Sequence, residues 1–116
     1  MKNNSTISSN KFFLGEGEDG IYSNITIEIK KSEQATINRG ANIQLQDEEI
    51  LRTIEKEFKT NWIERYKKDE IYLEIIILNV GIDPTGRKYK VDNSVGGVMH
   101  DALPKIGIQP PQIFGL

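Results

Sequence analysis

The sequence of 116 residues contains no cysteine, one histidine and one tryptophan. The absence of cysteine excludes disulfide bonds, cysteine nucleophiles and cysteine-based zinc sites, and it fits a reducing compartment. No hydrophobic run approaches the roughly 18 apolar residues that a membrane-spanning helix needs. The polar N-terminus, MKNNSTISSN, lacks the apolar region of a secretory signal. We therefore expect a soluble, cytoplasmic protein with no membrane partner.

A surplus of basic charge is also missing. The chain has 15 Lys and Arg against 17 Asp and Glu, for a net charge of -2. Proteins that bind phosphate backbones usually carry a basic surplus or a basic stripe on their surface. The charge balance therefore disfavours nucleic acid as the main ligand.

Length and apolar content indicate a single domain. Hydrophobic residues make up 37% of the chain, which is enough apolar material to offset the entropy of ordering one domain of this size. Residues 1–11 are rich in Asn and Ser and carry few apolar side chains, so we expect a flexible tail there. Residues 12–116 then form the domain.

The hydrophobic pattern predicts an α+β fold. Apolar and polar residues alternate over 21–30, which indicates a half-buried strand. Apolar residues at spacings of three and four predict a long amphipathic helix over 48–66, with Asp47 as its N-cap. We expect further strands at 41–45 and at 71–80, the latter central and covered on both faces, and a short helix from residue 93 or 94 to about 103. The sheet is expected to be small and mainly antiparallel or mixed, with the long helix on one face.

Three glycines in the stretch FFLGEGEDGIYSN, at residues 15, 17 and 20, fit the G-x-G-x-x-G pattern of phosphate-binding loops. A dinucleotide loop needs a helix after the glycines, because the helix N-terminus binds the pyrophosphate. A predicted strand follows here instead, and Glu16, Glu18 and Asp19 place negative charge where a phosphate would sit. The pattern therefore indicates an acidic hairpin or surface loop.

His100 and Asp101 are adjacent and invite a catalytic interpretation. Neighbouring side chains on a helix point to different faces, so the two residues do not form a dyad with each other. We expect a histidine at the surface or packed in the fold, and no cofactor.

Clusters of acidic residues suggest a function in protein binding. On a compact scaffold they steer association with a basic partner, such as a nuclease or a nucleic-acid-binding enzyme. Immunity proteins and phage-encoded inhibitors of defence systems are analogous. We expect a non-enzymatic binding protein that neutralises such a partner, aided by the Pro-containing segment 109–116. The expected contact residues are Glu16, Glu18, Asp19, Asp47, Glu48 and Glu49.

A different interpretation comes from the order of the motifs ITIEI, NRG at 38–40, GRKYK, Asp92-Asn93 and Asp101-Ala102-Leu103. Together they resemble the RusA family of Holliday-junction resolvases. The resemblance implies a small dimeric enzyme of mixed α/β fold that cuts branched DNA with Mg²⁺ held by aspartates. On this alternative the catalytic residues are Asp83, Asp92 and Asp101, with Asp92 and Asp101 holding the metal.

The sequence departs from the RusA pattern at several positions. Lys90 stands where the first aspartate of the family motif belongs, and glycine occupies the lysine position. The interval from Asp92 to Asp101 is one residue too long, and the stretch QPPQ at 109–112 replaces the terminal acids. The binding protein is therefore the preferred interpretation and the nuclease the alternative, while the sequence leaves the choice between monomer and homodimer undecided.

Overall fold

Strand β2, Ile21–Ser32, is the strand on which the sheet is built. Ile25, Ile27 and Ile29 are fully buried, and the polar side chains between them lie on the opposite face. Because successive side chains of a strand point to opposite faces, this alternation commits one face of the sheet to the core. The structure, a computed structural model, describes residues 4–41, 43 and 48–111.

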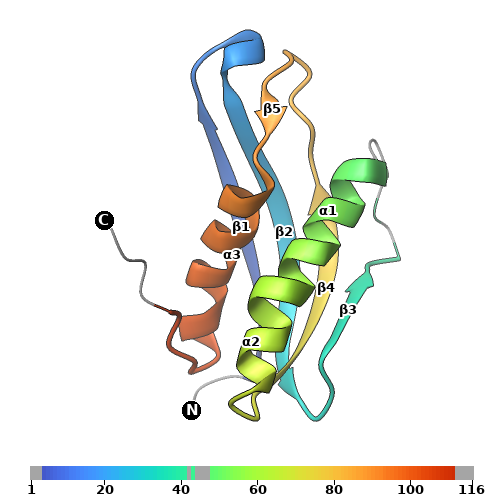
Figure 1. Ribbon diagram of the computed structural model, residues 1–116, viewed down its shortest axis with the longest axis vertical. Coiled ribbons are helices and arrows are strands. Elements are labelled where there is room, and N and C mark those ends of the chain that lie inside the picture. Colours follow the sequence, from blue (N-terminus) through green and yellow to red (C-terminus); the bar gives the residue numbers. More distant parts are fainter. Residues whose placement is uncertain (1–3, 42, 44–47, 112–116) are drawn as a thin grey trace.

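Three other strands pair directly with β2. Strands β1, Ser5–Leu14, and β4, Tyr72–Val80, flank it in antiparallel orientation, and the short β5, Lys88–Tyr89, pairs with its beginning in parallel. Strand β3, Thr36–Arg39, lies parallel to β4 on the far side, which gives the order β1-β2-β4-β3 (Figure 1). The sheet is therefore mixed, and the predicted α+β class is confirmed.

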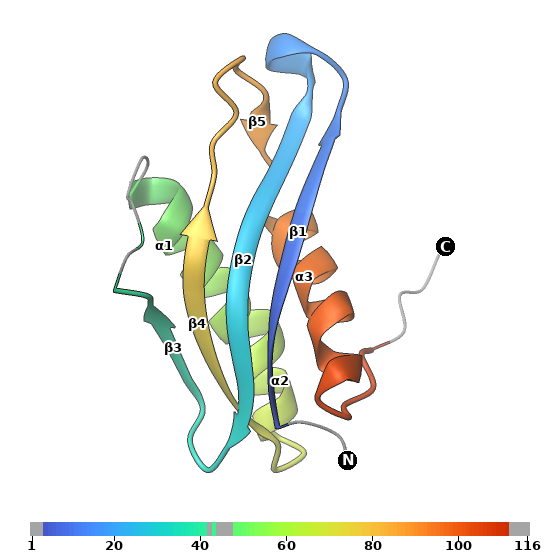
Figure 2. The ribbon, with the colours of Figure 1, turned by 180° about the vertical axis from the view of Figure 1, so that it is seen from behind.

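The helices cover one face of the sheet (Figures 1 and 2). Helix α1, Glu48–Phe58, continues through a π-helical turn, Lys59–Ile63, into α2, Glu64–Lys67. Helix α3, Val91–Lys105, packs beside it. In the described part of the chain, no helix combines the length and the apolar character needed to cross a membrane.

The buried face of the long helix follows the predicted apolar stripe. Residues at spacings of three and four meet the isoleucines of β2 and β4 and the apolar face of α3. The predicted helix over 48–66 is thus confirmed. Its buried residues are Leu51, Ile54, Phe58, Trp62, Ile63 and Tyr66.

The N-terminal segment differs from the expectation of a flexible tail. Residues 5–11 form the first part of β1, which pairs with β2 over its whole length. Only Ile7 gives this segment an apolar signal, so its composition alone resembles a loop. This segment is nevertheless a strand, because β2 provides hydrogen-bond partners for its backbone amides regardless of side-chain type.

Two other strand predictions need correction. The strand that follows β2 is β3, which includes Asn38 and Arg39 of the NRG motif and pairs with β4. Of the expected strand at 41–45, Ala41 and Ile43 are outside regular structure, and the other positions lie outside the described residues. Strand β4 is interior to the sheet, but helices cover only one of its faces, and burial alternates along it.

Helix α3 is longer than predicted despite its two glycines. It begins at Val91 and ends at Lys105, with Pro104 in its last turn. A Cβ at Gly97 would lie 2.3 Å from Nδ2 of Asn10. That amide donates to the backbone oxygens of Asn93 and Ser94, at 3.3 and 3.4 Å. Glycine therefore gives β1 its close approach to α3.

The hydrogen bonding of β1 predicts an alternating pattern of amide exchange. The amide of Lys31 donates to the carbonyl oxygen of Asn4 at 2.8 Å, so even-numbered residues 6–12 exchange backbone hydrogen bonds with β2. The backbone groups of odd-numbered residues 5–13 point away from β2. We expect their amides to exchange faster than the even-numbered ones by on the order of 100-fold, measured by hydrogen exchange with NMR. Equal protection of both sets would contradict an unoccupied outer edge.

Candidate functional site

An acidic turn joins β1 to β2 and forms the tip of a hairpin. Gly15 and Gly17 have φ angles of +78° and +56°, and a 3-10 turn spans Gly17–Asp19. A Cβ at Gly20 would lie 2.9 Å from Cγ of Arg87 and 3.0 Å from the carbonyl oxygen of Leu14. Gly15 and Gly17 therefore adopt left-handed backbone conformations, and Gly20 allows Arg87 and Leu14 to approach the backbone closely. The strand on each side confirms the predicted acidic hairpin.

Three carboxylates stand on this tip without compensating charge. Glu16, Glu18 and Asp19 are exposed. Within the described residues, none of their three carboxylates makes a hydrogen bond or an ion pair. Carboxylates held this close on a short turn repel one another and attract a cationic surface.

Apolar side chains are exposed along the strand that leads to the tip. Ile7, Phe12, Phe13 and Leu14 are 59, 38, 59 and 63% exposed, and they are the exposed large hydrophobic residues of the described chain. All four lie on β1. Single exposed apolar residues are common, but Phe12, Phe13 and Leu14 are consecutive, and because side chains alternate along a strand, they give both faces of β1 an apolar surface beside the tip. Sequence reasoning missed this surface because β1 was assigned in part to a tail.

Arg87 fastens the hairpin to the loop before β5. Its Nε donates to the carbonyl oxygen of Gly15 at 2.8 Å, and its guanidinium lies 4.8 Å from the centre of the Phe13 ring. The amide of Lys88 donates to the carbonyl oxygen of Gly20 at 3.1 Å. The hairpin is therefore supported from one side rather than free in solvent.

Asp83 anchors Arg87 in turn. Its buried carboxylate accepts hydrogen bonds from the amide and hydroxyl of Thr85, at 3.0 and 2.8 Å, and from Nη1 of Arg87 at 3.1 Å. Burial alone would raise the pKa of Asp83, but these hydrogen bonds to the ionised form outweigh it and lower the pKa to about 2. Asp83 is a catalytic candidate of the nuclease interpretation, but its carboxylate is hydrogen-bonded to residues of its own loop.

The expected acidic contact set is divided between two places. Asp47 lies outside the described residues, and Glu49 is exposed near the start of α1. Glu48 accepts hydrogen bonds from Arg39 at 2.8 and 3.1 Å and pairs with Arg52 at 3.3 Å. The bond to Arg39 lowers the pKa of Glu48. The start of α1 stands apart from the hairpin tip in both views (Figures 1 and 2), so Glu16, Glu18 and Asp19 are a cluster separate from Glu48 and Glu49.

The other two aspartates of the nuclease interpretation are on α3 but not together. Asp92 pairs with Lys90 at 3.6 Å, and Asp101 with Lys105 at 2.9 Å. The hydrogen bond from Lys105 lowers the pKa of Asp101. Nine residues of helix separate the two by about 13 Å and about half a turn. Among the residues that the structure describes, no group of three or more His, Asp or Glu side chains is suited to hold a metal ion.

His100 is packed in the fold and does not pair with Asp101. Its ring meets the indole of Trp62 edge-on at 5.6 Å. Its Nδ1 lies 2.8 Å from the carbonyl oxygen of Gly96, and its Nε2 lies 3.2 Å from that of Pro111. The hydroxyl of Tyr66 donates to the carbonyl oxygen of Gln109 at 3.1 Å. These contacts hold residues 109–111 of the expected C-terminal contact segment against the body, and residues 112–116 lie outside the described chain.

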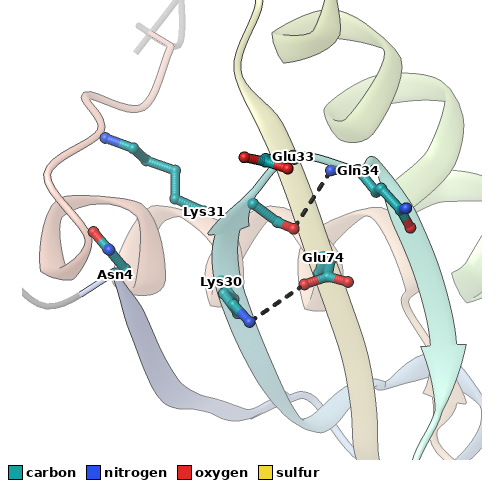
Figure 3. Close-up of a pocket in the computed structure, with 7 residues that line it drawn as sticks. Asn4, Lys30, Lys31, Glu33, Gln34 and Glu74 are labelled. Atoms are coloured by element: carbon teal, nitrogen blue, oxygen red, sulfur yellow. Dashed lines mark hydrogen bonds and ion pairs between the residues drawn. The ribbon is translucent and has the colours of Figure 1, made fainter.

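A depression of about 640 Å³ lies at the opposite end of β2 from the hairpin tip (Figure 3). Lys30 points across it towards Glu74 and pairs with that side chain at 3.8 Å, whereas Lys31 points away. The lining is polar, carries both signs of charge and is open to solvent, unlike the enclosed apolar pockets that hold small molecules. Its remaining lining residues are Asn4, Ser32, Glu33 and Gln34.

Comparison of the sequence with protein-family models gives no match, and comparison with curated proteins gives none either.

The anchoring role of Asp83 predicts a pH-dependent loss of stability on substitution. Its pKa in the folded protein, about 2, is below the ordinary value of 3.8. The carboxylate therefore stabilises the fold above pH 4, and this contribution is lost as the pH falls through 2. We expect Asp83→Asn to lower the Tm by about 5 °C at pH 7 and by progressively less towards pH 2, measured by calorimetry.

The matched control for this substitution is Asp19→Asn at the exposed tip. Because the carboxylate of Asp19 has no partner among the described residues, its replacement should change the Tm by less than about 2 °C at either pH. A constant effect of Asp83→Asn from pH 7 to pH 2 would contradict the role assigned to its charge.

Proposed function

We propose that the protein is a non-enzymatic binding protein that engages a basic protein partner through the β1–β2 hairpin. One observation carries the proposal. The exposed large hydrophobic side chains of the described chain all lie on β1, and β1 runs directly into a turn with three unpaired carboxylates. The hairpin thus combines apolar area with concentrated negative charge.

The two parts of this surface contribute differently to binding. Burial of Phe12, Phe13 and Leu14 against a partner supplies affinity, at about 25 cal/mol for each Å² of apolar surface removed from water. The carboxylates of the tip act mainly on the association rate and on the choice of partner. A basic surface is the one whose potential matches them.

The support from Arg87 favours binding without rearrangement. Its bond to Gly15 and its contact with Phe13 fix the turn and one apolar side chain before a partner arrives. A surface ordered in advance loses less conformational entropy on association. The Asp83 carboxylate neutralises Arg87, so this support does not cancel the charge of the tip.

The partner class follows from the charge. Nucleases and other nucleic-acid-binding enzymes carry basic surfaces where the phosphate backbone binds. An acidic hairpin that occupies such a surface excludes the nucleic acid. The protein would then neutralise its partner, as immunity proteins and phage-encoded inhibitors of defence systems do by analogy.

Charge reversal at the tip tests this proposal. The variant with Glu16→Lys, Glu18→Lys and Asp19→Lys should bind purified basic nucleases at least about 10-fold more weakly than the native chain at low salt. The difference in affinity between the two proteins should shrink at 0.5 M salt, because screening weakens both the attraction of the native tip and the repulsion of the reversed tip. Isothermal titration calorimetry on a panel of such enzymes gives both values.

A control with the same net charge separates position from overall charge. Glu33, Glu64 and Asp69 are exposed and lie outside the hairpin, and Glu33 follows the opposite end of β2. Their joint replacement by lysine should leave affinity within about 3-fold of the native value. If both triple variants weakened the affinity for the nuclease equally, the tip would not be the binding surface.

The RusA-type nuclease is the alternative proposal, supported by the order of the elements and by Asp92 and Asp101 on the helix after the basic loop. We expect no cleavage of branched or linear DNA in the presence of Mg²⁺ or Mn²⁺, assayed on denaturing gels. Cleavage by the native chain that disappears in Asp92→Asn and Asp101→Asn would establish the nuclease instead. Persistence in both variants would indicate a contaminant.

A further inference from the structure

We infer that the outer edge of β1, the edge facing away from β2, accepts an extended segment of the partner as an additional strand of the sheet. The inference rests on the proposed function and specifies the form in which the partner binds. Strand addition to an unpaired edge is a recurrent mode of peptide recognition, in which backbone hydrogen bonds give affinity and alternate side chains give specificity.

The backbone of β1 is arranged for this pairing. Its odd-numbered residues 5–13 direct their N–H and C=O groups outwards. Within the described chain, no backbone hydrogen bond reaches these outward groups. A ten-residue edge is long for an uncovered strand, since natural proteins usually blunt such edges with charges, bulges or proline. Here Lys11 is the one charged residue on the strand.

The side chains on the edge favour an apolar, alternating segment. Ile7, Ser9, Lys11 and Phe13 are all exposed and share the face of the sheet that the helices leave uncovered. An added strand would place its own alternate residues beside Ile7 and Phe13, where β-branched or aromatic side chains pair well. The small Ser9 between them leaves the backbone accessible.

Charge favours a peptide segment over a second copy of this chain. In an antiparallel edge-to-edge dimer, the start of the second copy's β1 would lie near the acidic tip. Residues 5–10 carry no charge, so they would not complement the three carboxylates, whereas a segment with a basic end would.

The acidic tip sets the direction of charge along the added segment. Glu16, Glu18 and Asp19 follow the C-terminal end of β1, so the end of the segment that lies near the tip should be basic. In antiparallel orientation that end is the N-terminus. The segment therefore has cationic residues at one end and alternating apolar residues along the remainder.

A synthetic peptide with this composition tests the inference. The probe is Lys-Arg followed by four Val-Thr pairs, with the reversed sequence as the orientation control. The fully N-methylated form, which has the same charge but no backbone donors, controls for electrostatic attraction. On binding of the probe, exchange of the amides of Ile7, Ser9, Lys11 and Phe13 should slow at least about 10-fold, whereas the amides already paired with β2 should not change. Binding of the N-methylated peptide with equal affinity would overturn strand addition.

A backbone variant provides the second arm. Ser9→Pro removes one outward N–H and spares the pairing with β2, a position at which an edge strand tolerates proline. It should weaken binding at least about 10-fold, whereas Ser9→Ala, which loses only the 2.8 Å hydroxyl contact with Thr26, should bind like the native chain. If Ser9→Pro does not fold, the N-methylated peptide decides the question.

The outcomes separate this inference from the proposed function. Binding that depends on the tip carboxylates but leaves the outward amides unprotected overturns strand addition and leaves the proposed function standing. Failure of all peptides to bind also overturns strand addition, because the titration with folded basic enzymes tests the proposed function independently. Protection of the outward amides in the free protein, with dimer mass by light scattering, would assign the edge to a second copy.

Discussion

The pairing of one strand with three others is the constraint on which the structure depends. Strand β2 holds β1, β4 and β5 directly. Buried and more exposed side chains alternate strictly along β2 around Ile25, Ile27 and Ile29, which are fully buried. A shift of the strand register by one residue would therefore move all three to the solvent face of the sheet. The register of β2 therefore fixes which backbone groups of β1 face outwards and where the hairpin turns.

The same register connects the two candidate sites of the sequence. The glycines at 15 and 20 meet Arg87 because β5 joins the beginning of β2. Asp83 then holds Arg87. A residue considered for catalysis thus supports the acidic hairpin considered for protein binding. The division of labour between stable support and exposed tip is common in binding proteins, whose contacts lie on loops positioned by a rigid scaffold.

Much of the fold could be predicted from sequence periodicity, and the errors have identifiable physical causes. The alternation in β2 and the apolar stripe from Ile50 to Tyr66 are properties of single elements, so they can be predicted from the sequence alone. The strand character of residues 5–11 arises from pairing with β2, which no local pattern in STISSNKFF reports. The hairpin and its acids were predictable from the glycines, but the exposed side chains of β1 became visible only once the tail was replaced by a strand. The separation of Asp92 from Asp101 depends on the true length of α3, which Gly97 permits by fitting against Asn10.

The π-helical turn at Lys59–Ile63 has a consequence for the phase of the long helix. Phe58 and Tyr66 are both buried, although eight residues of regular α-helix would leave them about 80° out of phase. A wider turn winds through fewer degrees per residue and takes up much of this difference. A chain shorter by one residue at this point would keep both side chains on the sheet with an ordinary helix. The wide turn therefore lets this longer segment present both aromatic rings to the same core.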